Sequence, residues 1–505
     1  MLMLSAAQAG AASYDVGPGQ ALTSIGAVPW ATLQPGDVVR IHHRADPYRE
    51  KWVLNRSGTE AQPIRVQGVP AADGSLPVIS GENASTVPGV NFWGDERGLI
   101  KIGGANTPSG SEPPAWIIIE DLKLQGAYKD YSFTDDGGAT KVYSNNAAGV
   151  YIEYGANVTI RRCEITDNGN GIFCAGDTSE LLIEDCYIHG NGVVDRFYEH
   201  NTYTEATGIT YRGNRFGPLR SGALGNNLKD RSAGLLVEYN WIEGGNRTLD
   251  LVDSHDQGRI NSGLYYDTWV IGNVLIELDD GLNSQVIHYG GDSGTTADYR
   301  KGTLHLYHNT IYSWRSGNTT LVRLSTGDES CDARNNIVHA ANGGSKLALL
   351  ESFGTISLTN NWITQGYVNS HDGGASITVT GAATTVSGAD PGLAAPVQDD
   401  YGLTPVSANR DAAIGIPGTQ LLLEYLPHQQ TGRRYDDGQP DRGALEYHSS
   451  VYRTIRTEVT TADVNLSLLE PVAAASDGDA AAGWTIHELF SDEDAVWTWQ
   501  PAGSS

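Results

Sequence analysis

A short pattern that ends in asparagine recurs along most of the chain and restricts the folds it can adopt. Each copy is a strand-like run of alternating character, usually closed by Asn, any residue, and an aliphatic or aromatic residue, as in LVEYNWI at 236–242. Their spacing of 23 to 36 residues is typical of a solenoid, in which each repeat stacks on the last. The turn residues of the copies are Cys163, Cys186, Asn214, Asn240, Asn273, Asn309, Asn335 and Asn361.

The repeat contains only short strand-like pieces, which excludes leucine-rich and helical repeats. A parallel β-helix fits, because its coils stack about 4.8 Å apart and its turn asparagines can form a ladder that satisfies backbone groups. The 61 glycines also fit many short strands joined by turns. A β-propeller is the alternative, although its blades need about 40 residues and four strands each.

The chain divides into three regions. Residues 1–12 have an apolar start followed by small residues, which predicts a signal peptide and a secreted or periplasmic protein. The basic start of such peptides is missing, so a disordered N-terminus is the alternative. Residues 13–450 are expected to form the β-helix. Residues 451–505 predict a linker and a short aromatic segment that caps the helix or packs on its side, with a separate binding module as the alternative.

Charge and cysteine usage exclude several classes of partner. The formal net charge of −27 argues against nucleic acid and anionic membranes, because no basic stripe exists to bind phosphates. No apolar run reaches the roughly 20 residues needed to cross a bilayer. Cys163 and Cys186 occupy equivalent repeat positions, which favours a stacked pair of small buried residues over a disulfide. No CxxC or His/Cys spacing predicts a zinc site.

Two insertions enlarge the repeat between Asn240 and Asn309. Residues 255–268 and 292–303 each follow the strand that precedes the ladder strand, so both are expected to project from one side of the solenoid. Insertions on one face of a repeat protein usually frame its binding surface.

Strand alternation predicts a line of ionisable side chains beside these insertions. If Leu228 faces the core, its neighbours Asn227 and Lys229 face outward, because side chains alternate along a strand. Arg231, two residues further on, faces outward with Lys229. The predicted column, one residue per coil, is His200, Lys229, Asp250, His288 and Arg323.

The same region concentrates positive charge. Five cations fall within twenty residues of a chain that has 33 Lys and Arg in all, so an anionic substrate is expected here. The alternative is a structural network in which the cations pair with Asp230, Glu238 or Asp250. The five are Arg212, Arg215, Arg220, Lys229 and Arg231.

Aromatic side chains on or beside the same strands are candidates for stacking on sugar rings. They are Tyr151, Phe173, Tyr203 and Tyr289, of which at least half are expected in the core. The residues predicted to bind substrate are Asn227, Arg212, Arg220, Tyr203, His288, Tyr289 and Arg323.

One chemistry that fits this set is β-elimination of a uronate polymer. A base removes the proton next to the carboxylate, while cations neutralise the charge that develops. Lys229 would be the base if neighbouring cations lower its pKa. Arg231 would neutralise the carboxylate, and His200 would assist as acid or base.

The other chemistry is hydrolysis, which needs two carboxylates that flank the scissile bond. Asp250 with Asp253, or with Asp256 in the following loop, could supply them. A third hypothesis is a non-catalytic polysaccharide-binding or spike-like adhesin, which would trimerise through residues 451–505.

The asparagine turns are similar to the pattern of right-handed β-helix pectate and alginate lyases. The stretch GNNLKDRSAGLLVEYNWIEGGNRTLDLV (225–252) resembles the catalytic coils of chondroitinase B and of β-helical alginate lyases. The resemblance implies a right-handed helix and a lyase, and it places Lys229 at the family's catalytic lysine.

The sequence also departs from that family pattern. Val252 and Asp253 stand where the family has an Arg-His pair, so His200 or His255 is expected to take the missing partner's role. Asparagines stand in the region of the family's acidic calcium ligands, which leaves a calcium cofactor unmatched.

Together these observations predict an all-β, right-handed single-stranded parallel β-helix (a solenoid) with loop insertions on one face. We expect a monomer that cleaves an acidic polysaccharide by β-elimination, with a β-helical glycoside hydrolase as the runner-up. The predicted catalytic set is Lys229, Arg231, His200, Asp250 and His255.

Overall fold

The computed structural model describes most of the chain. The described residues are 11–104, 113–280, 283–418, 421–435 and 438–448, with the backbone of strands β39 (Trp484–Ser491) and β40 (Asp494–Pro501). The predicted signal peptide lies almost wholly outside them, as does the predicted linker up to residue 483.

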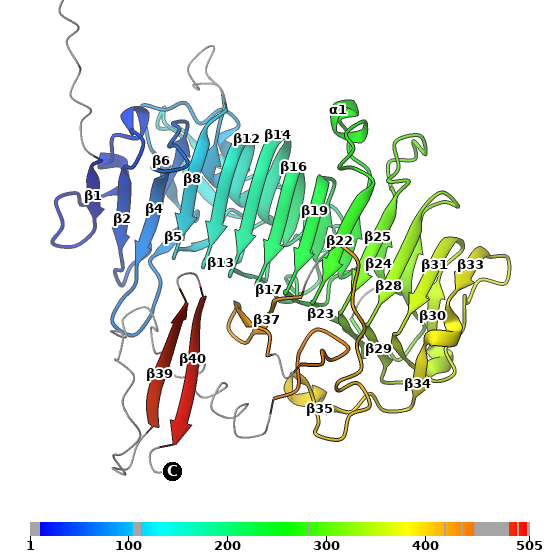
Figure 1. Ribbon diagram of the computed structural model, residues 1–505. Coiled ribbons are helices and arrows are strands. Elements are labelled where there is room, and N and C mark those ends of the chain that lie inside the picture. The colour runs from blue at the N-terminus through cyan, green and yellow to red at the C-terminus, as the bar shows by residue number, and fades with distance from the viewer. Residues whose placement is uncertain are drawn as a thin grey trace, which may run out of the picture.

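The chain coils into a β-helix whose strands form three faces (Figure 1). Faces 1 and 2 share a 23-stranded sheet, and face 3 is an 11-stranded sheet. Faces 1 and 2 merge because strand β12 (Ala148–Arg161) pairs with β7 (Gly98–Ile102) along its first half and with β8 (Ala115–Glu120) along its second. The pairings between successive coils are parallel, which confirms the predicted parallel β-helix.

The strands of each face follow one another along the axis. Face 1 contains β3 (Glu50–Leu54), β7, the first halves of β12, β14 (Asn170–Glu184) and β16 (Thr202–Arg212), then β18 (Leu228–Asp230), β21 (Leu249–Leu251), β24 (Gln285–Tyr289), β27 (Thr319–Leu324) and β30 (Leu347–Leu350). Face 2 contains β1 (Ser13–Val16), β2 (Val38–His42), β4 (Ile64–Val69), β8, the second halves of β12, β14 and β16, then β19 (Ala233–Glu238), β22 (Asp267–Ile271), β25 (Thr303–Tyr307), β28 (Ser330–Arg334), β31 (Phe353–Thr359) and β33 (Ser376–Thr380). Face 3 contains β5 (Val78–Ser80), β9 (Lys123–Gln125), β13 (Glu164–Ile165), β15 (Tyr187–Ile188), β17 (Arg215–Phe216), β20 (Trp241–Glu243), β23 (Val274–Glu277), β26 (Thr310–Ser313), β29 (Ile337–Ala340), β32 (Trp362–Thr364) and β34 (Val386–Gly388).

In the described part of the chain, seven further strands and one α-helix lie outside these runs. They are β6 (Ala84–Thr86), β10 (Ser132–Thr134), β11 (Thr140–Val142), β35 (Leu393–Ala395), β36 (Asp400–Leu403), β37 (Leu423–Leu426), β38 (Gln430–Arg433) and helix α1 (Gln257–Ile260). Among the described residues no helix is both long and apolar enough to cross a membrane.

An asparagine ladder runs along the turn between faces 2 and 3. Each amide before the last rung donates to the carboxamide oxygen of the next coil, for example Asn240 Nδ2 to Asn273 Oδ1 at 3.0 Å. Because every carboxamide also bonds backbone groups of the turn, the ladder satisfies polar atoms that would otherwise be buried unpaired. Its members are Asn214, Asn240, Asn273, Asn309, Asn336 and Asn361.

The prediction was wrong for one rung of this ladder. Asn336 occupies it, whereas the neighbouring Asn335 adopts a left-handed φ of 54° and donates to His308 Nε2. Either residue of the Asn335–Asn336 pair fits the sequence pattern. In the structure the first occupies the left-handed turn position and the second occupies the ladder. The prediction for Cys163 and Cys186 is confirmed, because both are buried free thiols at the same turn.

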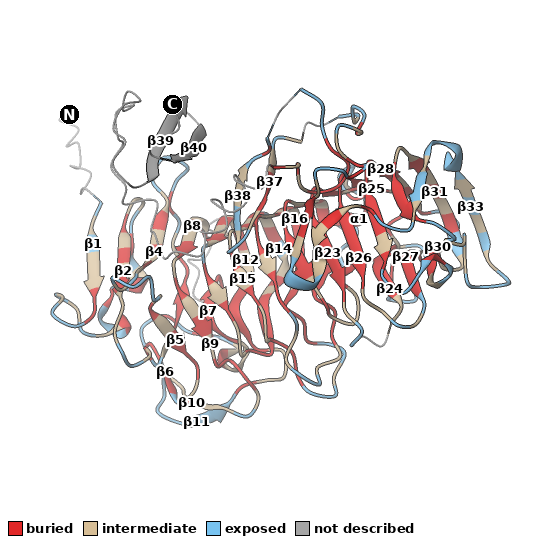
Figure 2. Cartoon of the chain, turned by 90° about the horizontal axis from the view of Figure 1, so that it is seen from below, coloured by how far each residue is buried: buried red, intermediate tan, exposed pale blue. Residues whose placement is uncertain are grey.

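A stack of aliphatic side chains fixes the direction of the strands on face 1. Leu228, Leu249, Ile287 and Val322 are register partners on successive coils and are all fully buried. Buried residues continue along the interior of the whole helix (Figure 2). Each inward residue turns its neighbours outward, so this stack sets the column of side chains on the outer surface of face 1.

Asn227 is an exception to that alternation. It is fully buried and accepts a hydrogen bond from Asn201 Nδ2 at 2.8 Å, while its own amide donates to the Glu243 carbonyl at 2.7 Å. The prediction that it faces outward was wrong, because it lies just before strand β18, inside a second chain of asparagine hydrogen bonds.

Residues beyond the last coil pack on face 3. Leu393, Tyr401 and Tyr425 form a separate hydrophobic cluster with Trp241 and Trp362 of that face. This segment therefore covers part of the side of the helix, although the predicted boundary at residue 450 itself lies outside the described residues.

Candidate active site

A cleft of about 1110 Å³ opens on the outer surface of face 1, beside the two insertions. Strands β14, β16, β18 and β21 supply its floor through Phe173, Tyr203, Lys229 and Asp250. The first insertion contributes His255 to its wall, and the second contributes Asp292. The expectation that the insertions frame one surface is therefore met.

The column of outward side chains is mostly as predicted. Lys229, Asp250, His288 and Arg323 are register partners on four successive strands. The partner of Lys229 on the preceding coil is Tyr203, so the prediction of His200 was wrong. The reason is that strand β16 begins at Thr202, two residues after His200.

Lys229 is an ammonium ion held between two carboxylates. Its Nζ lies 2.5 Å from Asp250 Oδ2 and 2.6 Å from Asp292 Oδ2. Burial by itself would lower the pKa of Lys229, but Asp250 and Asp292 outweigh burial and raise it above its ordinary value. The prediction that neighbouring cations prepare Lys229 as a base is not supported, because its nearest neighbours are anions.

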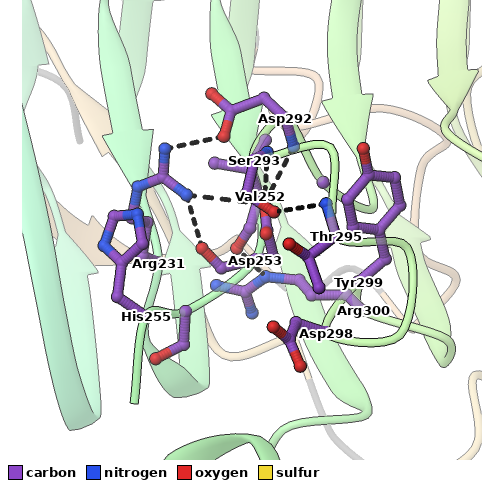
Figure 3. Close-up of polar contacts among 12 residues, drawn as sticks. Arg231, Val252, Asp253, His255, Asp292, Ser293, Thr295, Asp298, Tyr299 and Arg300 are labelled. Atoms are coloured by element: carbon purple, nitrogen blue, oxygen red, sulfur yellow. Dashed lines mark hydrogen bonds and ion pairs between the residues drawn. The ribbon is translucent and has the colours of Figure 1, made fainter.

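Arg231 connects the floor of the cleft to the second insertion (Figure 3). Its Nη2 lies 2.6 Å from Asp292 Oδ1, its Nε donates to Tyr203 Oη at 2.8 Å, and its Nη1 bonds the carbonyl of Asp253. The Asp253 carboxylate in turn accepts the backbone N–H of Asp292 at 2.8 Å. The end of strand β21 thus anchors the loop that carries Asp292.

Asp250 is the most heavily bonded carboxylate of the cleft. Besides Lys229 it accepts from Asn226 Nδ2 at 2.7 Å and bonds His288 Nδ1 at 2.8 Å, and Arg247 lies 3.4 Å away. Although burial opposes ionisation, Lys229 and His288 hold the pKa of Asp250 well below its ordinary value. Asp250 is therefore an anion that orients its neighbours and is unsuited to donate a proton.

His255 is the most exposed titratable side chain of the predicted catalytic set. Its side chain is 57% exposed, and its Nδ1 lies 3.3 Å from Glu205 Oε2. Glu205 also accepts the backbone N–H of His255 at 2.8 Å. A carboxylate at Nδ1 leaves Nε2 as the ring nitrogen that can exchange a proton with a ligand.

His200 has a different environment. It is buried, and its Nδ1 accepts the backbone N–H of Asn226 at 2.9 Å. Burial, assisted by the charge of Lys229, lowers the pKa of His200 to about 3. The ring is therefore neutral with its proton on Nε2, which suits it to donate a hydrogen bond to a ligand.

Aromatic rings form a shelf at one end of the cleft. Phe173 and Tyr203 lie in parallel planes, 3° apart, with centroids 5.2 Å apart. Phe197 and Tyr198 also line the cleft and are 48% and 74% exposed, which sequence reasoning missed because they lie in a loop outside the repeat. Tyr289, predicted to bind substrate, lies fully buried in the core.

Several other predicted binding residues lie away from the cleft or are already engaged. Arg212 is on face 2 and pairs with Glu238 at 2.7 Å, as the structural alternative predicted. Arg220 pairs with Asp167 at 2.8 Å and lies over the Tyr128 ring. His288 is buried between Asp250 and Ser325, so it positions Asp250 and does not face a ligand.

Arg323 and Arg215 complete the predicted cations. Arg323 extends the column beyond the cleft, where it pairs with Glu351 at 3.2 Å. Arg215 lies on face 3 and faces Glu243 at 3.6 Å. Of the five clustered cations, only Lys229 and Arg231 line the cleft.

The carboxylates predicted to pair with Asp250 in hydrolysis have structural contacts instead. Asp253 is fully buried and bonds the loop backbone, while Asp256 caps helix α1 by accepting from Arg259 N at 2.8 Å. The second carboxylate beside Asp250 is Asp292, which no periodic signal in the sequence marks because it lies in an insertion.

The donors around Lys229 do not fit a calcium ion. Asp250 and Asp292 are both engaged by the Lys229 ammonium, and an ammonium ion in that position repels a divalent cation. Within the described ranges, no cluster of three His, Cys, Asp or Glu side chains could hold a metal.

Comparison with known proteins agrees with the architecture. A family model described as "Right handed beta helix region" matches residues 78–273, which gives the predicted hand of the parallel coils. Together with the parallel pairing of the coils, this match shows a right-handed parallel β-helix fold. A search of curated proteins finds no match.

A search of solved structures finds matches of low sequence identity to this chain. They include a pectate lyase, Pel9A, with 11% identity and a TM-score of 0.41 over 86% of this chain and 96% of that one. A GH136 lacto-N-biosidase from Eubacterium ramulus has 12% identity and a TM-score of 0.45 over 74% of this chain and 68% of that one. An alginate lyase from Paenibacillus sp. str. FPU-7 has 13% identity and a TM-score of 0.31 over 70% of this chain and 93% of that one.

Proposed function

We propose that the protein cleaves an acidic polysaccharide by β-elimination in the cleft on face 1. The observation that carries this proposal is the convergence of two cations on one carboxylate. Lys229 and Arg231 each lie 2.6 Å from a different oxygen of Asp292. A uronate carboxylate bound in the same way would have its charge neutralised as an enolate-like anion develops beside it.

The neighbouring groups suit the remaining steps. His255, oriented by Glu205, takes the proton from the carbon next to the carboxylate. The electron pair of that C–H bond forms a carbon–carbon double bond, and the glycosidic C–O bond on the adjacent carbon breaks. Tyr203 Oη then protonates the departing oxygen, while the neutral His200 ring donates a hydrogen bond from Nε2 to the ligand, so that protons and electrons balance.

Two further features support a saccharide as the ligand. The stacked Phe173 and Tyr203 rings line the cleft and give it an apolar wall beside which a sugar ring can pack. Asn226 also lines the cleft, and its Oδ1 is a buried acceptor without a hydrogen-bond partner in the described part of the chain, which a small shift of the side chain would present to a sugar hydroxyl. A polymer substrate also fits a secreted or periplasmic monomer.

The test is to incubate the protein with a panel of uronate polymers and to follow the ultraviolet absorbance of unsaturated products. Lys229→Ala should lower kcat by about 10²–10³-fold, the usual cost of removing one charge-stabilising group. Full activity in Lys229→Ala would contradict the assignment, while Asn318→Ala, an exposed change outside the cleft, serves as the control.

Retaining glycoside hydrolysis is a second candidate, favoured by one observation. Lys229 Nζ lies 2.5 Å from an oxygen of Asp250 and 2.6 Å from an oxygen of Asp292. The separation of these two oxygens therefore cannot exceed the sum of the two distances. That upper limit just reaches the carboxyl separation of roughly 5–5.5 Å in retaining enzymes, in which Asp250, held as an anion, would be the nucleophile and Asp292 the acid. New reducing ends without unsaturated products would favour hydrolysis, and binding without either product would favour an adhesin.

A further inference from the structure

The charges that surround the cleft floor already balance one another. Lys229, Arg231 and Arg247 face the carboxylates of Asp250, Asp253 and Asp292 in a connected set of ion pairs. Three cations and three anions leave no formal positive charge for a fourth carboxylate. A uronate can gain a strong ionic contact here only if one of the three aspartates gives up its place.

Asp292 differs from the other two aspartates in exposure. Its side chain is 35% exposed, compared with 2% for Asp250 and 1% for Asp253. Asp250 lies in the buried strand β21 and Asp253 lies just after it, where neighbouring groups surround both. Asp292 instead reaches the two cations from the solvent side, which is the side from which a ligand enters.

The contacts of Asp292 also make its side chain replaceable. Its two carboxylate oxygens bond Lys229 and Arg231, one oxygen to each cation. Its backbone is held separately, because the Asp292 N–H donates to Asp253 Oδ1 and the Gly291 N–H donates to Ser325 Oγ, at 2.8 and 2.9 Å. Rotation of one side chain would vacate the carboxylate position while the loop stays in place (Figure 3).

We infer that Asp292 is a built-in competitor of the substrate carboxylate and thereby determines how tightly the cleft binds uronates. This inference rests on the proposed function. Lys229 and Arg231 are each only 7% exposed, and buried cations without partners are costly. Asp292 satisfies them in the free protein, and a substrate carboxylate replaces it with the same two contacts.

The inference is tested by binding, with no need for turnover. Galacturonate and glucuronate are titrated into wild-type protein and Asp292→Asn by calorimetry, with galactose and glucose as neutral probes. Removing the competing charge should tighten binding of at least one uronate by about tenfold, because two cations then lack an anionic partner. Binding of the neutral sugars should not tighten.

Two further variants separate charge from structure. Asp292→Glu keeps the charge and should bind uronates as the wild type does. Asp328→Asn removes an acidic side chain that is 65% exposed and lies 3.4 Å from Lys301, so it reports the effect of net charge alone. Thermal unfolding gives an independent reading, since a uronate should raise the Tm of Asp292→Asn more than that of the wild type.

Each outcome decides the inference. Uronate binding that is unchanged or weaker in Asp292→Asn, equal tightening in Asp328→Asn, or no measurable uronate binding to either protein would overturn it. Failure of the proposed function would give a different result, in the activity assay. In that case no uronate polymer yields unsaturated products, although tighter uronate binding by Asp292→Asn would still support Asp292 as the competitor.

Discussion

At the scale of single residues, the direction of a side chain was easier to predict than its chemical state. Alternation from Leu228 placed Lys229 on the outer surface, where it lines the cleft. Its state depends on Asp292, which is 63 residues away in sequence and arrives through a loop. No local pattern connects the two residues, so the sequence predicted a neutral base where the structure has a paired ammonium ion.

The exposed histidine provides a residue-scale test of the proposed mechanism. His255→Ala should lower kcat by about 10²–10⁴-fold, the range expected when a general base is lost. Because the side chain is 57% exposed, the unfolding temperature should change little. Added imidazole should restore part of the activity of His255→Ala but none of that of Lys229→Ala, and equal rescue of both would contradict the assignment.

At the scale of elements, the asparagine period identified the coils because the same residue type hydrogen-bonds the turn between faces 2 and 3 in successive coils. The prediction was wrong at Asn335 and Asn336, where two adjacent asparagines fit the pattern. It was also wrong where a strand begins later than the pattern implied, at Thr202. Hydrogen-bond geometry decides both cases. Period and composition do not contain that information.

The ladder itself can be tested at one rung. Asn273 is fully buried, donates to Asn309 Oδ1 at 3.0 Å and to the Val237 carbonyl at 2.9 Å, and accepts from Asn240 N. Asn273→Ala should lower the free energy of unfolding by at least about 1–3 kcal/mol, because it leaves buried polar groups unpaired. Chemical denaturation measures the loss, and Asn318→Ala, at an exposed position, should cost much less.

At the scale of the whole molecule, each coil of a solenoid contacts only its neighbours, so the stability of each end depends on the side chains located there. The N-terminal coils contain a lysine, Lys51, that is fully buried. Its Nζ lies 3.7 Å from the centre of the Phe133 ring and 4.5 Å from that of Phe92. Burial lowers the pKa of Lys51 to about 7, so we expect the stability of this end of the helix to depend on pH near neutrality.

The direction in which stability changes with pH follows from the charge of Lys51 in the folded and unfolded chains. Below about pH 7 Lys51 is charged in both the folded and unfolded chains, and the folded state bears the full cost of a buried charge. Between pH 7 and the ordinary lysine pKa of about 10.5 only the unfolded chain stays charged, so the cost to folding declines as pH rises. Lys51→Met should therefore raise the Tm more at pH 6 than at pH 9.

The comparison needs a matched substitution. Lys301 is 37% exposed, and Lys301→Met should change the Tm little and equally at both pH values. A larger gain for Lys51→Met at pH 9 than at pH 6 would contradict the expected direction, because the folded chain bears less cost once Lys51 is neutral.

The register of face 1 limits how this protein can evolve. Tyr203, Lys229 and Asp250 come from successive coils, and the loop that carries Asp292 leaves the strand after them. Gaining or losing one coil between Lys229 and Tyr289 would move Asp292 along the axis by about 4.8 Å relative to Lys229, which is too far for the present ion pair. Coils can be added or lost at either end of the helix without that effect, so length variation among related chains should be confined to the ends.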